Sequence, residues 1–208
     1  HAVAEHAVAL ALAALRRIAT LDAELKRGEW ARTPIAQLEG KVFGVVGFGA
    51  IGRRVARLVA AFGARALVAT AGPENGRVAP TGARAAAIDA LLAESDVVSL
   101  HLRLDAVTAG YLSRARLGLM KPGAILVNTA RGALVDRDAL LDALRGGHLG
   151  CAALDVFHEE PLPADDPLRA LPNVILTPHI AGNTPEVIAT GLSQAVSNIS
   201  RFLRTPLP

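Results

Sequence analysis

The sequence has one cysteine, three lysines, few aromatic residues and no long uninterrupted apolar run. A single cysteine, Cys151, excludes an intrachain disulfide and fits a reducing compartment, so we expect a cytoplasmic protein. The longest apolar run, Ala7 to Leu15, is too short to span a membrane. Aromatic residues make up 3% of the chain, and the net charge of +3 comes from scattered arginines. We therefore expect neither a membrane nor a nucleic-acid partner.

What the chain does have is apolar residues in a regular order. Its 208 residues are 51% hydrophobic, which suffices for one large core and excludes intrinsic disorder. The segment from Ala2 to about Arg27 contains neither glycine nor proline, which predicts one long helix ended by Gly28. Beyond Gly40, predicted strands at 41–46, 66–69, 97–100, 124–128, 152–156 and 174–176 alternate with helices, among them 88–93, 137–145 and 185–203. This alternation predicts an α/β fold with a doubly wound parallel sheet and long flanking N- and C-terminal helices.

A glycine-rich turn follows the first predicted strand and opens an amphipathic helix. In this context Gly47 permits a tight turn, Gly49 lets the backbone approach a diphosphate, and Gly52 lets the helix pack against the strand. No Gly-Lys-Ser/Thr follows, which excludes a P-loop. The pattern predicts a Rossmann-like dinucleotide-binding domain with these glycines, Ala50 and Ile51 at the pyrophosphate. We also predict one apolar face on the helix, made of Ile51, Val55, Leu58, Val59 and Phe62.

The second predicted strand lacks the acidic residue expected at its end. Thr70 occupies that position, and a threonine can neither bind both ribose hydroxyls nor repel a 2′-phosphate. The nearest downstream arginine is Arg77. The cofactor is therefore NAD or NADP, and we hypothesise a relaxed choice in which NADP(H) is tolerated.

Polar residues end three of the later strands. Arg131 follows one of them, Asp155 and Glu160 follow another, and His179 follows the last. Ligands of open α/β sheets bind at the carboxyl ends of the strands, so these side chains can converge on one crevice.

These segments together resemble the D-isomer-specific 2-hydroxyacid dehydrogenase family over essentially the whole chain. The resemblance implies an NAD(P)-dependent oxidoreductase that interconverts a small 2-oxo acid and a D-2-hydroxy acid, and a homodimer. The matching motifs are Val46–Gly52, Asn128–Gly132, Leu154–Val156 with Glu160–Pro161, and Thr177–His179, while Ala4-Glu5-His6 resembles the start of the interdomain helix.

The family's roles pass to the matching residues. By this resemblance, Arg131 holds the substrate carboxylate and 2-oxygen, His179 is the general acid and base, and Glu160 pairs with His179. Asp155 would orient the nicotinamide carboxamide. Further cofactor contacts would come from His101, Leu102, Thr129, Ala130, Ala181 and Gly182, together with Arg131 and His179. No metal ligand is assigned.

The resemblance also divides the chain into parts. Residues 1–40 would form an interdomain and dimerisation helix with its linker, 41–183 the dinucleotide-binding domain, and 184–208 a helix returning toward a substrate domain. The family's first lobe would precede residue 1, so we expect this chain to bind dinucleotide but to turn over poorly. Glu5 and His6 would face the neighbouring lobe or subunit, and the apolar first helix suggests a dimer interface.

Two other readings compete with the enzyme. A non-catalytic NAD(H)-binding module, like the corepressors related to this family, would show a damaged Arg–Glu–His set or an added interaction tail. A different α/β protein, such as a methyltransferase, would carry an acidic residue after the second strand. Among the remaining residues, we interpret His148 and His158 as surface or capping histidines and Cys151 as a small core residue.

Overall fold

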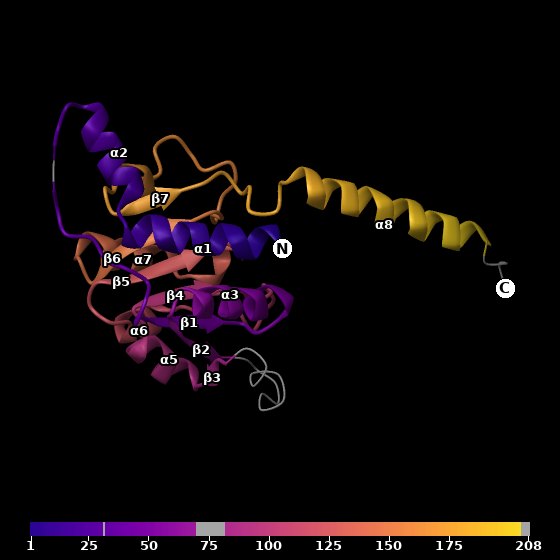
Figure 1. Ribbon diagram of the computed structural model, residues 1–208, viewed down its shortest axis with the longest axis horizontal. Coiled ribbons are helices and arrows are strands. Elements are labelled where there is room, and N and C mark those ends of the chain that lie inside the picture. The colour runs from indigo at the N-terminus through magenta and orange to yellow at the C-terminus, as the bar shows by residue number, and fades with distance from the viewer. Residues whose placement is uncertain (31, 70–81, 205–208) are drawn as a thin grey trace.

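The computed structural model describes residues 1–30, 32–69 and 82–204 (Figure 1). Its sheet has the strand order β3-β2-β1-β4-β5-β6-β7, and each pair of neighbours is parallel. The order reverses between β1 and β4, so the predicted doubly wound parallel sheet is confirmed. Thr70 and Arg77 lie outside the described residues. The strands are β1 (Val42–Val46), β2 (Arg65–Ala69), β3 (Arg84–Ala85), β4 (Val97–Leu100), β5 (Ala124–Asn128), β6 (Leu149–Leu154) and β7 (Val174–Leu176).

Helices cover both faces of this sheet. On one face lie α1 (Ala2–Leu15) and α3 (Ala50–Ala61), and on the other α5 (Ile88–Glu94), α6 (Arg114–Leu119) and α7 (Arg137–Arg145). Successive strand residues point to opposite faces. Phe43 and Val45 therefore join the core under α1 and α3, while Val42 and Val46 join the core under α5 and α7. The middle strands are buried on both sides, as their continuous apolar runs predicted.

The prediction of one long N-terminal helix is wrong. The helix α1 ends at Leu15, Arg17 adopts a left-handed conformation with φ of 51°, and a separate helix α2 runs from Ile18 to Lys26. Residues of α1 pack on β5, β6 and α3, whereas α2 has no buried residue. The break therefore lies where the helix loses contact with the sheet. The apolar face of α1 is thus largely covered by its own domain.

The last helix, α8 (Pro185–Arg204), projects away from the body of the domain (Figure 1). Its start lies near the N-terminus of α1, and Gly182 approaches Val3. No helix in the described part of the chain is long and apolar enough to cross a membrane. The apolar side chains of α8 are 41–71% exposed: Val187, Ile188, Leu192, Val196, Ile199 and Phe202.

The predicted apolar face of α3 needs a correction. Val55 and Val59 are fully buried, but Ile51 is 40% and Phe62 49% exposed. Phe62 caps the helix beyond its last turn, and Ile51 lies in its first turn, at the edge where the glycine-rich turn ends. Helical periodicity cannot detect this, because it does not say how far the underlying sheet extends.

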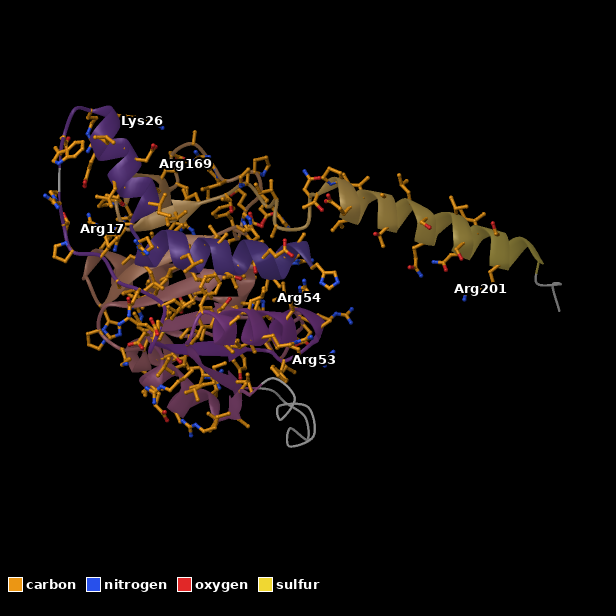
Figure 2. All side chains as sticks on the ribbon, in the orientation of Figure 1. Arg17, Lys26, Arg53, Arg54, Arg169 and Arg201 are labelled. Atoms are coloured by element: carbon orange, nitrogen blue, oxygen red, sulfur yellow. The ribbon has the colours of Figure 1, made fainter. Side chains whose placement is uncertain are left out.

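The basic side chains spread over the molecule. Figure 2 shows Arg17 and Lys26 near α2, Arg53 and Arg54 at the start of α3, and Arg201 on α8. Two short 3-10 helices, η2 (Gly132–Leu134) and η3 (Pro167–Ala170), follow β5 and precede β7.

Candidate functional site

The glycine-rich turn joins β1 to α3 at the carboxyl edge of the sheet. Gly47 has φ of 97°, and a Cβ there would lie 2.7 Å from the carbonyl carbon of His101. A Cβ on Gly52 would lie 2.1 Å from the carbonyl oxygen of Gly47. Packing within the chain therefore requires both glycines. A Cβ on Gly49, in contrast, would meet no atom within 4 Å.

Gly49 is the N-cap of α3 and has no side chain to bond the first N–H groups of that helix. Such free N–H groups, together with the helix dipole, favour an anion such as a diphosphate. The glycine-rich turn therefore fits a dinucleotide. Ala50 and Ile51 lie in the first turn of α3.

The next residues of the predicted cofactor site follow β4 and β5. His101 lies against Gly47, its Nε2 is 2.9 Å from Ser99 Oγ, and burial lowers the pKa of its imidazole to about 4. Leu102 follows it and is partly buried. Thr129 Oγ1 is buried without a hydrogen-bond partner among the described residues. An orphaned hydroxyl at this edge is a free polar contact for a ligand, which again fits a bound dinucleotide.

The central geometry is the contact between His179 and Glu160. His179 Nδ1 donates to Glu160 Oε2 at 2.6 Å, and Glu160 Oε1 accepts the N–H of Phe157 at 2.9 Å. Burial by itself would raise the pKa of the Glu160 carboxyl, but the hydrogen bonds from His179 and Phe157 and the charge of Arg131 lower it below its ordinary value. Glu160 thus stays ionised at neutral pH and accepts the Nδ1–H of His179. The structure brings this predicted pair together.

Arg131 stands at the start of η2, directly after β5. Its guanidinium is exposed and donates to the carbonyl of Ala130 at 2.6 Å, which leaves most of its donors for a ligand. The buried Asn128 shapes this loop, because its amide donates to the carbonyl of Arg131 at 2.9 Å and accepts the N–H of Ala130 at 3.0 Å. Asn128 belongs to the sequence motif, but the motif alone does not predict this role.

Gly132 is the second residue whose role we did not predict. A Cβ there would lie 2.1 Å from the carbonyl carbon of Phe157. The loop after β5 therefore crosses the loop after β6 at backbone contact. This crossing holds the Arg131 segment against the segment that carries Glu160.

Asp155 is fully buried at the end of β6. Its carboxylate accepts the hydroxyl of Thr177 at 2.6 Å and the N–H groups of Ile180 at 3.0 Å and Ala181 at 2.9 Å. Its bonds within the chain thus fix the loop that carries His179. The predicted contact of Asp155 with a nicotinamide stays a prediction. Gly182, the last predicted contact, follows this loop.

The expectation that His6 faces a neighbouring lobe is wrong. His6 Nε2 lies 3.1 Å from Thr177 Oγ1 and 3.4 Å from Asp155 Oδ1, within the domain. Among the described residues, the carboxylate of Glu5 pairs with Arg54 alone, at 3.8 Å. His6 points inward because α1 crosses the carboxyl edge of β6 and β7 there.

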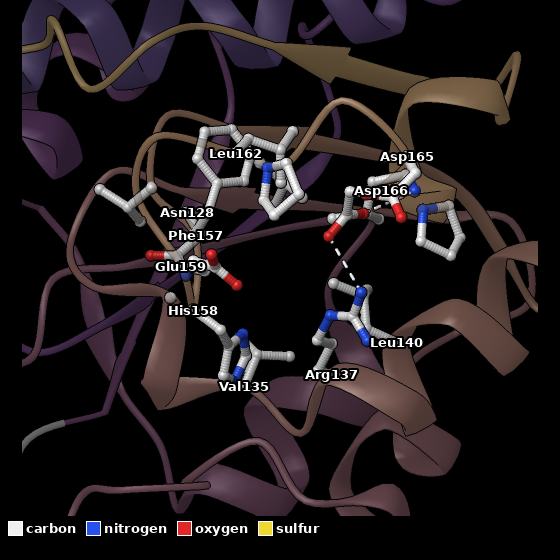
Figure 3. A pocket seen from close by; sticks show the side chains of 16 residues that line it. Asn128, Val135, Arg137, Leu140, Phe157, His158, Glu159, Leu162, Asp165 and Asp166 are labelled. Atoms are coloured by element: carbon white, nitrogen blue, oxygen red, sulfur yellow. Dashed lines mark hydrogen bonds and ion pairs between the residues drawn. The ribbon is translucent and has the colours of Figure 1, made fainter.

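Two cavities flank the segment after β6. One, of about 620 Å³, is lined by Glu160 and His179 together with apolar residues such as Leu176. The other, of about 490 Å³, appears in Figure 3 and lies over α7, where Arg137 donates to Asp166 at 2.9 Å. His158 is exposed, as its interpretation as a surface histidine predicted, and it lines this second cavity. None of Arg131, Glu160 and His179 lines it. The first cavity is therefore the one beside the candidate chemistry.

The described residues contain no group of three or more His, Cys, Asp and Glu that could hold a metal ion. The other interpreted side chains are structural. His148 Nε2 lies 3.1 Å from the carbonyl of Leu117 near the end of α6, and Cys151 is a half-buried residue of β6.

The fold and site define the chain's class as a dinucleotide-binding α/β domain, with a glycine-rich turn after β1 and a contact between His179 and Glu160 beyond the ends of β7 and β6. Comparison with known proteins gives the family. Residues 8–181 match the model of "D-isomer specific 2-hydroxyacid dehydrogenase, NAD binding domain". The chain belongs to this family, and the cofactor that its domain binds is NAD or NADP.

The relatives include whole enzymes. The chain is 45% identical over 188 residues to D-3-phosphoglycerate dehydrogenase of Mycobacterium tuberculosis, a match that covers 89% of this chain and 35% of that protein. It is 41% identical to glyoxylate reductase of Aeropyrum pernix, covering 100% of this chain and 64% of that protein. The crystal structure of D-lactate dehydrogenase from Aquifex aeolicus, complexed with NAD and lactic acid, matches with a TM-score of 0.89 and 32% identity, over 98% of this chain and 66% of that one. The chain thus spans between about one third and two thirds of the length of these relatives.

Proposed function

We propose that this chain is the cofactor-binding and catalytic part of an NAD(P)-dependent D-2-hydroxyacid dehydrogenase, which interconverts a small 2-oxo acid and a D-2-hydroxy acid. The observation that carries the proposal is the 2.6 Å contact between His179 Nδ1 and Glu160 Oε2, which lie beyond the carboxyl ends of β7 and β6. A non-catalytic NAD(H)-binding module would have no need for this pair.

The roles follow from the contacts. The bound nicotinamide cofactor supplies or accepts the hydride. Glu160 holds His179 through Nδ1, so Nε2 is left to give a proton to the 2-oxo oxygen and to take it back in the reverse direction. The forked guanidinium of Arg131 binds the substrate carboxylate. The N–H groups at the start of α3 bind the pyrophosphate between Gly47 and Gly52, alongside the contacts predicted above.

The arrangement of the chain in the whole enzyme is also a proposal. Residues 41–183 form the dinucleotide-binding domain, and residues 184–208 return to a substrate-binding lobe. The exposed apolar face of α8 and the greater length of the relatives support this lobe. For a homodimer, residues 1–40 supply the surface, since Ile18 and Leu25 are each 56% exposed and Trp30 is 81% exposed.

The test separates cofactor binding from turnover. NADH and NADPH are titrated by fluorescence, and oxidation of either is then followed with glyoxylate, hydroxypyruvate or pyruvate. We expect saturable binding of both cofactors and slow turnover of a 2-oxo acid. His179→Asn is the matched variant, because asparagine tolerates the left-handed conformation of this residue. It should keep cofactor binding and abolish turnover. Binding without turnover, even with a substrate lobe supplied, would favour the non-catalytic module, and strict NAD(H) selectivity would refute the relaxed cofactor choice.

A further inference from the structure

The hydroxyl of Thr177 lies between a buried carboxylate and a histidine from another part of the chain. Thr177 Oγ1 donates to Asp155 Oδ1 at 2.6 Å and lies 3.1 Å from His6 Nε2. His6 belongs to α1, Asp155 follows β6, and Thr177 follows β7. Three segments far apart in the sequence therefore meet at one hydroxyl.

Proton counting fixes the direction of these hydrogen bonds. A threonine hydroxyl has a single hydrogen, and the short contact with Asp155 uses it. Toward His6 the same oxygen can only accept, so His6 Nε2 carries a proton and donates it. His6 Nε2 also lies 3.4 Å from Asp155 Oδ1. His6 is thus a donor to the Thr177–Asp155 pair in either charge state of its ring.

This cluster holds the segment on which His179 sits. Thr177 is anchored on one side of His179, while the N–H groups of Ile180 and Ala181 are anchored to Asp155 on the other. His179 itself has φ of 53°, a conformation uncommon for a residue with a Cβ. A neighbour that fixes both flanks can maintain such a backbone.

We propose that His6 is a positioning residue for His179. Acting through Thr177 and Asp155, it holds the 177–181 loop so that His179 Nδ1 meets Glu160. The role of His179 as acid and base rests on the proposed function, but its position can be measured without turnover. The inference links the first helix of the chain to the acid–base pair.

The experiment compares His6→Leu, which removes the donor, with His6→Gln, which keeps an N–H donor on the side chain. Glu5→Gln is the control on the same helix, since Glu5 makes only the exposed 3.8 Å contact with Arg54. Imidazole nitrogen correlation spectra report the Nδ1–H tautomer of His179, and the backbone coupling of His179 reports its φ. Where the protein turns over, kcat and KM are measured as well.

We expect the His179 tautomer and coupling to change in His6→Leu and to be retained in His6→Gln and Glu5→Gln. The kcat of His6→Leu should fall about 10- to 100-fold, with KM for the cofactor unchanged. Unchanged His179 signals in a folded His6→Leu would overturn the proposal. Should His6→Leu fail to fold, the same cluster can be tested at Thr177. Thr177→Val removes the hydroxyl that joins His6 to Asp155, and Thr177→Ser keeps it. Equal His179 signals in these two variants would also overturn the proposal. Absence of turnover even with a substrate lobe supplied would contradict the proposed function alone, because the spectra still decide the positioning.

Discussion

The substitution Gly49→Ala separates what the fold needs from what a ligand needs. The backbone of Gly49 is extended, with φ of −73°, and a Cβ there would meet no protein atom within 4 Å. Alanine therefore fits without strain and lowers the entropy of the unfolded chain. We expect the free energy of unfolding to stay constant or to rise by up to about 1 kcal/mol.

Cofactor binding should respond in the opposite sense. A methyl group at Gly49 occupies the space through which a phosphate approaches the first N–H groups of α3. Displacing the phosphate costs at least one charge-assisted hydrogen bond, about 1.5–3 kcal/mol. The Kd for NADH should then rise about 10- to 100-fold. Fluorescence titration with NADH measures this change, and urea denaturation measures the stability of the same protein.

Gly118→Ala is the matched control. It lies within α6, also has open space around its Cβ, and is remote from the glycine-rich turn. Its Kd for NADH should equal that of the unmodified chain. If Gly49→Ala binds NADH as tightly as Gly118→Ala does, the diphosphate does not bind at the start of α3, and the reasoning about this turn is refuted.

Three further predictions concern stability and reactivity. Gly132→Ala places a Cβ 2.1 Å from the carbonyl carbon of Phe157. Urea denaturation should therefore show a free energy of unfolding that is lower by about 1–3 kcal/mol or more. An unchanged free energy of unfolding would contradict the backbone crossing. Burial lowers the pKa of the His101 imidazole from 6.5 to about 4, so between these pH values the unfolded chain binds a proton that the folded chain does not. The free energy of unfolding should therefore fall as the pH drops from 6.5 toward 4. A His101→Gln variant with the same pH profile would contradict this prediction. Burial raises the pKa of the Cys151 thiol to about 11, so alkylation at neutral pH should be slow until the chain unfolds, and rapid labelling of the folded protein would count against it.

The sequence predicted best those elements whose signals are local. The helix α7 has the predicted bounds, because Asp136 caps it with a hydrogen bond to the N–H of Ala139 and Gly146 follows its last turn. The turn between β1 and α3 could be predicted because its glycines are spaced for one geometry. The family motifs led to Glu160 and His179 in the same way.

Elements that depend on tertiary contacts were missed. The break between α1 and α2 occurs where the sheet beneath the helix ends, and no local signal marks Arg17. The short β3 is formed by pairing with β2, and α6 is a single short helix packed between its neighbours. The role of Gly132 depends on a backbone that crosses it from a distant segment. The contact of His6 with Thr177 joins residues 171 positions apart, which no spacing argument can predict.

The most direct test of the account is a titration of the uniformly isotope-labelled chain with NADH, followed by nuclear magnetic resonance. The central claim is that one site contains both the glycine-rich turn and the His179–Glu160 pair. We predict that the amides of Gly47, Gly49 and Gly52 and the ring signals of His179 shift together, with a single saturable Kd. Shifts confined to other residues, or no shift at saturating NADH, would contradict it.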